Sequence, residues 1–191
     1  MGSRDMNGMF VKATSLDGMF VVEASRFEDE RGSFSRIFCE EALAAIRPGL
    51  AFKQVNLSRT RSPGTVRGLH FQVPPAEECK YIRCMRGRVF DVAVDLRAGS
   101  PTFLRWYGVE LAGNGTQQVF IPEGFAHGFQ SLTEDVEMLY FHTEAWSREH
   151  ERTVCYDEPL IGISWPLPAT CVSQKDRQAP RLHRTFEGIQ I

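Results

Sequence analysis

The 191-residue sequence lacks the features that mark several large classes of protein. It has no apolar run of about 18 residues and no signal-peptide pattern, so we expect no membrane-spanning helix. Its five cysteines are scattered without a CxxC pair, which favours reduced thiols over a zinc site or a disulfide framework. The formal net charge is −2, which gives no bulk attraction to nucleic acid or an anionic membrane. We therefore expect a cytoplasmic protein that binds any anion through a local basic cluster.

The composition also gives no sign of disorder, of a fibre or of a second domain. Hydrophobic residues make up 42 % of the chain and charged residues 24 %, which is ordinary for a globular protein. No linker, internal repeat or low-complexity run divides the sequence. We expect a flexible, polar tail over residues 1–18 and a single domain over residues 19–191.

Short segments rich in β-branched and aromatic residues follow one another along most of the chain. Gly, Pro, Ser or Asn bounds each of them, as in strands joined by turns. Expected strands lie at residues 52–60, 65–73, 80–96, 103–111, 117–122, 126–132 and 137–146, after a strand–turn–strand unit at 20–38. A short helix is expected within residues 39–50, which include a Pro–Gly stop near their end. The pattern predicts an all-β fold, a cupin-like antiparallel jelly-roll barrel with a few short helices, mainly in the N-terminal third and near the C-terminus.

The segment GTVRGLHFQVPPAEECK, residues 64–80, gathers polar side chains around a glycine. Arg67 and His70 are three residues apart, so a regular strand would place them on opposite faces unless a bulge at Gly68 intervenes. A single strand histidine is more often a packed or solvent-facing residue than a catalytic one. However, His127 lies in a similar glycine-framed segment, IPEGFAHGF. The two histidines suggest one shared pocket.

Ligands of small β-barrels bind inside the mouth, so inward-facing polar residues on different strands are the candidates for a site. A cupin metal site usually has two histidines two residues apart, whereas here Gln72 follows His70. Metal-free acid–base chemistry is the favoured interpretation, because a neutral imidazole accepts a proton, an ammonium group stabilises an oxyanion and a phenol returns a proton. The candidate residues for this chemistry are His70, Lys80, Asp91, His127 and Tyr140.

No single motif decides the family, but nine short elements in the right order are together very specific. They are DERGSF (29–34), QVNLS (54–58), RGLHFQ (67–72), Lys80, GRVFDVAVDLRAGSPTF (87–103), IPEGFAHGF (121–129), Tyr140, ISWP (163–166) and SQKD (173–176). From about residue 19 to residue 180 the chain resembles the dTDP-4-dehydrorhamnose 3,5-epimerase family. The resemblance implies a dimeric jelly roll, without metal or cofactor, that inverts carbons beside the C4 ketone of a nucleotide-linked 4-keto-6-deoxyhexose.

The same resemblance assigns roles to individual residues. His70 would be the general base, balanced by Asp176, and Lys80 would stabilise the enolate at the C4 oxygen. Tyr140 would be the acid that reprotonates the opposite face of the ring. The substrate-binding residues that it implies are Arg31, Phe34, Gln54, Asn56, Arg67, Gln72, His127, Trp146, Glu151 and Lys175, with Asp91 as a partner of His127.

Two positions depart from the rhamnose-pathway members of this family. Trp146 stands where those members carry a tyrosine that stacks on thymine, and Arg36 replaces a glutamate in the nucleotide site. The nucleotide base, the end product and the inversion of C3, C5 or both therefore stay open. A non-catalytic nucleotide-sugar-binding protein, a ketoisomerase and a metal-dependent oxygenase of the same fold are alternatives. The resemblance also implies a homodimer in which residues 19–27 join the sheet of the neighbour.

Overall fold

The computed structural model describes residues 4–5 and 8–191. Residues 1–3 and 6–7, which belong to the expected tail, lie outside the described residues. The strands are β1 (Arg4–Asp5), β2 (Met9–Ala13), β3 (Phe20–Ala24), β4 (Arg26–Asp29), β5 (Gly32–Ser35), β6 (Gln54–Thr60), β7 (Thr65–Gln72), β8 (Lys80–Arg86), β9 (Arg88–Asp95), β10 (Trp106–Ala112), β11 (Gln117–Ile121), β12 (Phe125–Ser131), β13 (Val136–His142), β14 (Glu151–Thr153) and β15 (Cys171–Val172). The helices of this part of the chain are α1 (Glu40–Ala44) and α2 (Gln174–Arg177).

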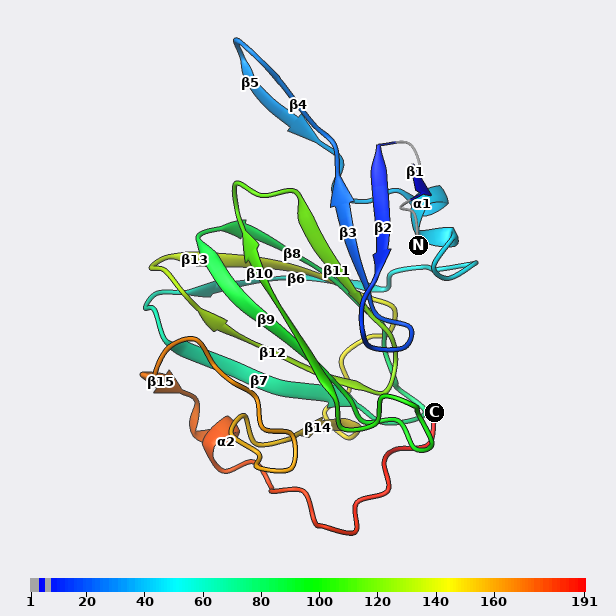
Figure 1. Ribbon diagram of the computed structural model, residues 1–191, viewed down its shortest axis with the longest axis vertical. Helices are drawn as coiled ribbons and strands as arrows, with labels where there is room; N and C mark the ends of the chain where they lie inside the picture. The colour runs from blue at the N-terminus through cyan, green and yellow to red at the C-terminus, as the bar shows by residue number, and fades with distance from the viewer. Residues whose placement is uncertain (1–3, 6–7) are drawn as a thin grey trace.

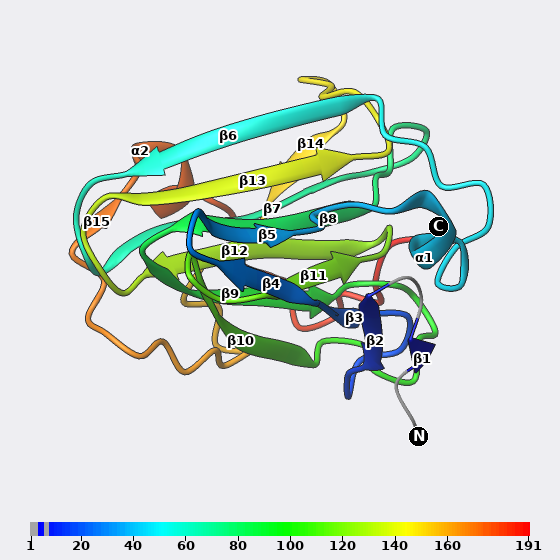
Figure 2. The same cartoon turned by 90° about the horizontal axis from the view of Figure 1, so that it is seen from above.

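Two sheets pack face to face and form the barrel (Figures 1 and 2). The first sheet has the strand order β1-β2-β3-β11-β8-β13-β6, and the second has the order β10-β9-β12-β7-β14. All of these pairings are antiparallel, and β15 adds a short parallel pairing to β7. The predicted all-β jelly roll with a few short helices is confirmed.

The core follows from the alternation of side chains along each strand. On β8, Ile82 and Cys84 point between the sheets, where they join a fully buried apolar cluster with Phe129 of β12. Tyr81, one residue away, points to the other face and packs with Leu43 of α1 in a second cluster. The helix α1 therefore covers part of the outer face of the first sheet.

The elements before residue 50 differ from expectation in three places. Residues 9–13, within the expected tail, form β2 and bury Met9 completely. β3 pairs with β2 and β11 of its own chain, so of residues 19–27 only the part after Ala24 has a strand edge left for a neighbour's sheet. The helix is shorter than the expected 39–50, because the chain turns at Leu43, whose carbonyl accepts hydrogen bonds from the amides of Ile46 and Arg47.

β4 and β5 form a separate two-stranded ribbon that projects beyond the barrel (Figure 1). Its aromatic side chains are open to solvent, with Phe27 66 % and Phe34 69 % exposed. The outer face of the first sheet also carries exposed apolar side chains on β6, Val55 and Leu57. The ribbon and this face thus both present apolar side chains to solvent.

The chain after β13 packs against the second sheet. Trp165 lies edge-on to Phe90 of β9, and its indole N–H donates a hydrogen bond to the carbonyl of Tyr156. Further along, β15 pairs with β7 and leads directly into α2. In the described part of the chain, no helix is long and apolar enough to cross a membrane.

Candidate active site

A β-bulge on β7 determines how two side chains of this strand are directed. Between Arg67 and His70, two residues of β7 face the single residue Gly128 of β12. Gly68 has a φ of +121°, and a Cβ atom at this position would lie 2.6 Å from the Cα of Gly128. Only glycine fits such a backbone at so close an approach. The bulge expected at Gly68 is confirmed, and it turns Arg67 and His70 into the same pocket.

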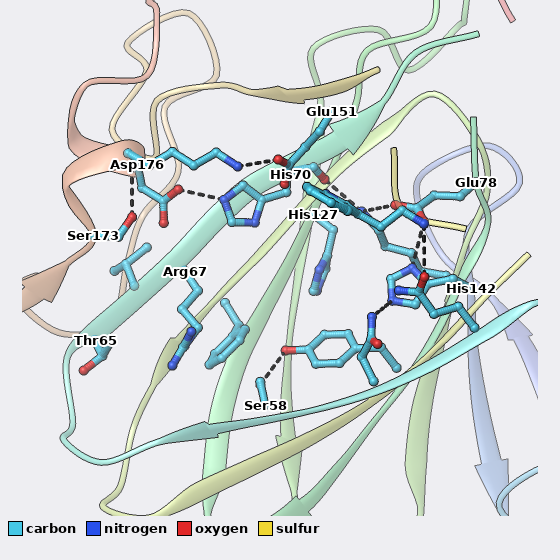
Figure 3. Close-up of a pocket in the computed structure, with 18 of the residues that line it drawn as sticks. Ser58, Thr65, Arg67, His70, Glu78, His127, His142, Glu151, Ser173 and Asp176 are labelled. Atoms are coloured by element: carbon cyan, nitrogen blue, oxygen red, sulfur yellow. Dashed lines mark hydrogen bonds and ion pairs between the residues drawn. The ribbon is translucent and has the colours of Figure 1, made fainter. Parts of the chain in front are cut away.

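That pocket lies between the two sheets and has a volume of about 530 Å³, which is in the usual range for a small-molecule site. Figure 3 shows polar side chains from both sheets and from α2 converging on it. Most of the residues expected at the site line this pocket. They are Gln54, Asn56, Arg67, His70, Lys80, His127, Tyr140, Trp146, Glu151, Lys175 and Asp176.

His70 is held by the carboxylate of Asp176, with Nε2 and Oδ1 2.7 Å apart (Figure 3). Ser173 caps α2 by accepting a hydrogen bond from the Asp176 amide, which fixes the start of the helix. Burial alone would raise the pKa of Asp176. Hydrogen bonds from His70 and from the Gly68 amide lower it by more than burial raises it, so the net pKa is below the ordinary value. An ionised Asp176 accepts the proton on Nε2, which leaves Nδ1 as the basic nitrogen.

Replacement of Asp176 by asparagine should remove the contribution of the ionised carboxylate to the free energy of unfolding. The pKa of Asp176 is lower in the folded chain than the unfolded value of about 4, so its stabilisation is complete above that pH and is lost as the pH falls through the folded pKa. We expect Asp176→Asn to lower the free energy of unfolding by about 2 kcal/mol at pH 7. Urea denaturation between pH 3 and pH 7 should show this difference shrinking below about pH 4. A difference independent of pH would contradict the assignment.

Lys80 lies beside His70, and only 7 % of its side chain is exposed. Its Nζ donates a hydrogen bond of 2.9 Å to the carbonyl oxygen of His70 and forms an ion pair of 3.2 Å with Glu78. A buried ammonium group with fixed partners is suited to stabilise negative charge that develops on a substrate oxygen.

Tyr140 enters the pocket from β13 of the first sheet, whereas His70 belongs to the second sheet. The two therefore approach a ligand from opposite walls. The Tyr140 hydroxyl is 3.1 Å from Oγ of Ser58. Burial raises the pKa of the phenol well above its ordinary value, so Tyr140 is protonated at neutral pH and can donate a proton.

His127 pairs with Asp91 as expected, with Nε2 and Oδ2 2.9 Å apart and both side chains buried. His127 and Asp91 thus form a second imidazole–carboxylate pair beside that of His70 and Asp176. In the described residues, no group of three or more His, Cys, Asp or Glu side chains is arranged to hold a metal ion.

The remaining pocket residues surround these pairs. Lys175 forms an ion pair of 2.6 Å with Glu151 at the side of the pocket near α2. Arg67 is exposed, and its guanidinium donates to the Thr60 hydroxyl at 3.0 Å. Trp146 is 56 % exposed, so its indole is open to a ligand.

Three of the expected binding residues do not line the pocket. Arg31 and Phe34 lie on the projecting β4–β5 ribbon. Gln72 is buried, and it holds the chain after β13 by donating to the carbonyl of Ala145 and accepting from the amide of Ser147. It also donates to the carbonyl of Ala76 in the loop before β8.

Several pocket residues were not anticipated, among them the polar residues Ser58, Glu78 and His142. Strand periodicity carries a signal for two of them, because Ser58 follows Asn56 by two positions and His142 follows Tyr140 by two. Glu78 lies in the loop before β8 and has no such signal.

Sequence comparisons decide the family. A model of the family described as dTDP-4-dehydrorhamnose 3,5-epimerase matches residues 13–184. The dTDP-4-dehydrorhamnose 3,5-epimerase of Sinorhizobium fredii is 40 % identical over 183 residues, which cover 95 % of this chain and 94 % of that protein. The chain belongs to the dTDP-4-dehydrorhamnose 3,5-epimerase family. It is therefore an isomerase, a nucleotide-sugar epimerase, and the resemblance seen in its sequence is confirmed.

Solved structures agree with this assignment. The dTDP-4-dehydrorhamnose 3,5-epimerase of Bacillus anthracis, solved with TDP and PPi bound, superimposes on this epimerase with a TM-score of 0.88 at 36 % identity, covering 91 % of this chain and 99 % of the other. ChmJ of Streptomyces bikiniensis, a 3'-monoepimerase in complex with dTDP-quinovose, gives a TM-score of 0.82 at 31 % identity, covering 88 % and 85 %. The fold thus accommodates both double and single epimerases.

Proposed function

We propose that this epimerase inverts C3, C5 or both in a dTDP-linked 4-keto-6-deoxyhexose. The observation that best supports this proposal is the placement of His70 and Tyr140 on opposite walls of one pocket, with Lys80 next to His70. A base and an acid on opposite sides of a sugar ring are what an inversion by proton transfer requires.

The reaction follows from these three side chains. Nδ1 of His70 takes a proton from the carbon beside the ketone, and the electron pair of the C–H bond moves to the C4 oxygen to form an enolate. The ammonium of Lys80 stabilises the enolate oxygen. The enolate then collapses and takes a proton from the Tyr140 hydroxyl on the other face. Solvent returns a proton to the phenolate and removes one from the imidazolium, which restores the enzyme.

The nucleotide diphosphate requires local positive charge, because the chain as a whole is slightly acidic. Arg67 and Lys175 both line the pocket and supply this charge. We place the thymine base of the nucleotide near Trp146, whose exposed indole offers a stacking surface. All five cysteines are free thiols, which fits the cytoplasm as the place of this reaction.

A homodimer would explain the position of Arg31 and Phe34. Both lie on the ribbon away from the pocket of their own chain, so they can reach a ligand only in the pocket of a second copy. The exposed Val55 and Leu57 on the outer face of the first sheet provide an apolar surface for that copy to cover. We therefore propose that each pocket is completed by the ribbon of its partner.

Leu57→Asp should break this dimer, since it places a charge in the middle of the apolar face. We expect light scattering to report a dimer for the wild type and a monomer for Leu57→Asp. The monomer should bind dTDP about tenfold more weakly, because it lacks the partner's Phe34. Leu57→Met, which keeps the apolar contact, is the matched control. A monomeric variant with wild-type affinity would show that the ribbon does not serve the partner's pocket.

The activity itself can be tested with dTDP-4-keto-6-deoxyglucose in D2O. Proton abstraction beside the ketone should place deuterium at C3, C5 or both, as read by NMR and mass spectrometry. A non-catalytic binding protein would be stabilised by dTDP without exchange. A panel of nucleoside diphosphates in a thermal-shift assay identifies the base, because ligands that bind the native state raise the melting temperature.

A further inference from the structure

A third imidazole–carboxylate pair lies in the pocket, and the reaction proposed above does not use it. Nδ1 of His142 is 2.8 Å from Oε2 of Glu78 (Figure 3). Only 12 % of the His142 side chain and 9 % of the Glu78 side chain are exposed. The pair therefore repeats the arrangement of His70 with Asp176 and of His127 with Asp91.

Glu78 connects this pair to Lys80. While Oε2 accepts from His142, the other carboxylate oxygen lies 3.2 Å from Nζ of Lys80. Burial alone would raise the pKa of Glu78. The charge of Lys80 and the hydrogen bond from His142 lower it by more than burial raises it, so the net pKa is below the ordinary value. An ionised carboxylate thus bridges an imidazole and the ammonium that faces the substrate oxygen.

His142 is fixed on three sides. Its ring stacks on Tyr140, with centroids 6.1 Å apart and planes at 28°. Its Nε2 is 3.3 Å from Nδ2 of Asn56. An amide nitrogen can only donate, so Nε2 accepts this bond and the ring proton sits on Nδ1, where it is donated to Glu78. The tautomer is therefore set by the two partners, and Nε2 is the nitrogen that can gain a proton.

We infer that His142 is a positioning residue which, through Glu78, orients the ammonium of Lys80 and sets how much of its charge the substrate oxyanion experiences. This inference rests on the proposed epimerisation. With a neutral imidazole, the charges of Lys80 and Glu78 offset each other. With an imidazolium, the three groups carry one net positive charge, and more of the Lys80 charge is left for the enolate oxygen.

The other charged groups near His142 do not change the balance of charge among His142, Glu78 and Lys80. Lys53 and Glu144 flank the end of β13, and they form an ion pair of 2.5 Å with each other. The Lys53 amide donates to the carbonyl of His142, so this part of the backbone is also fixed. Tyr140, stacked on the ring, stays neutral because burial raises its pKa. Protonation of His142 is therefore transmitted to Lys80 through Glu78.

The first test needs no substrate. We would label the lysine Cε atoms of the full-length protein with ¹³C, assign the Lys80 signal from its loss in Lys80→Arg, and follow it by NMR from pH 5 to pH 9. The dependence of the Lys80 signal on pH should differ between the wild type and His142→Phe, which keeps a ring against Tyr140 but cannot bond Glu78. Glu78→Gln should show the same difference from the wild type. The Lys175 signal, whose partner is Glu151, is the internal control. An unchanged pH dependence of the Lys80 signal in His142→Phe would overturn the inference.

The second test measures exchange of the sugar protons in D2O. His142→Phe should lower kcat about tenfold and leave KM within about twofold of the wild type. His142→Gln, whose amide can still donate to Glu78, should recover most of kcat but lose the dependence on pH that His142 causes. Equal activity of the wild type and both variants, or a rise in KM alone, would overturn the inference. A wild-type protein without any exchange would refute the proposed function instead, and the lysine titration would still decide the role of His142.

Discussion

His70→Asn should lower the rate of deuterium incorporation at both C3 and C5 by about 10³-fold, within the range that a general base contributes. Asparagine can keep a hydrogen bond toward Asp176, but its amide cannot accept a proton from carbon. The rate is measured by NMR on the dTDP-linked keto sugar in D2O, under single-turnover conditions. Because the loss lies in the chemical step, the affinity for dTDP should change by less than about threefold.

A matched control for this variant is His183→Asn. His183 is exposed near the C-terminus and bonds to Thr185, outside the pocket. It should retain wild-type exchange. If His70→Asn loses exchange at only one carbon, a second base must serve the other carbon, and the assignment of His70 to both would be wrong.

Tyr140→Phe should separate the two halves of the reaction. The ring still fills the wall of the pocket, but the hydroxyl that lies 3.1 Å from Ser58 is gone. Abstraction by His70 should continue within about tenfold of the wild-type rate, while net inversion should fall by about 10²-fold. The measurement compares deuterium that appears in the unchanged substrate with deuterium that appears in the inverted product.

Tyr107→Phe is the control for loss of a hydroxyl elsewhere in the barrel. Tyr107 packs against the same core from β10 and does not line the pocket. It should behave like the wild type. If Tyr140→Phe loses abstraction and inversion to the same extent, Tyr140 is not the acid of the second step.

The parts of the site that depend on local pattern could be predicted from the sequence. Gln54 and Asn56 alternate along one strand, and a glycine between Arg67 and His70 indicated the bulge that joins them. The link between Glu78 and His142 could not be predicted, since 64 residues separate them and only the pairing of β8 with β13 brings them together. Contacts of this kind depend on sheet register, which no local pattern specifies.

The N-terminal elements show the same limit. Residues 20–29 form one nearly continuous strand pattern in the sequence, yet the chain leaves the first sheet at Ser25 and continues as the separate ribbon. The division follows from pairing: β3 has partners on both sides, whereas β4 pairs with β5. The Pro–Gly stop within the expected helix at residues 39–50 indicated where the helical region ends, but the helix itself is limited to Glu40–Ala44.

The close approach of Gly68 to Gly128 affects the conformational entropy that is lost when a ligand binds. The points at which the side chains of Arg67 and His70 leave the backbone are set by main-chain atoms of two adjacent strands. A ligand that spans both groups therefore meets an arrangement that already exists, and little conformational entropy is lost when it binds. Preorganisation of this kind is built into the backbone, so a methyl group added at position 68 should disturb it as much as a change in either side chain.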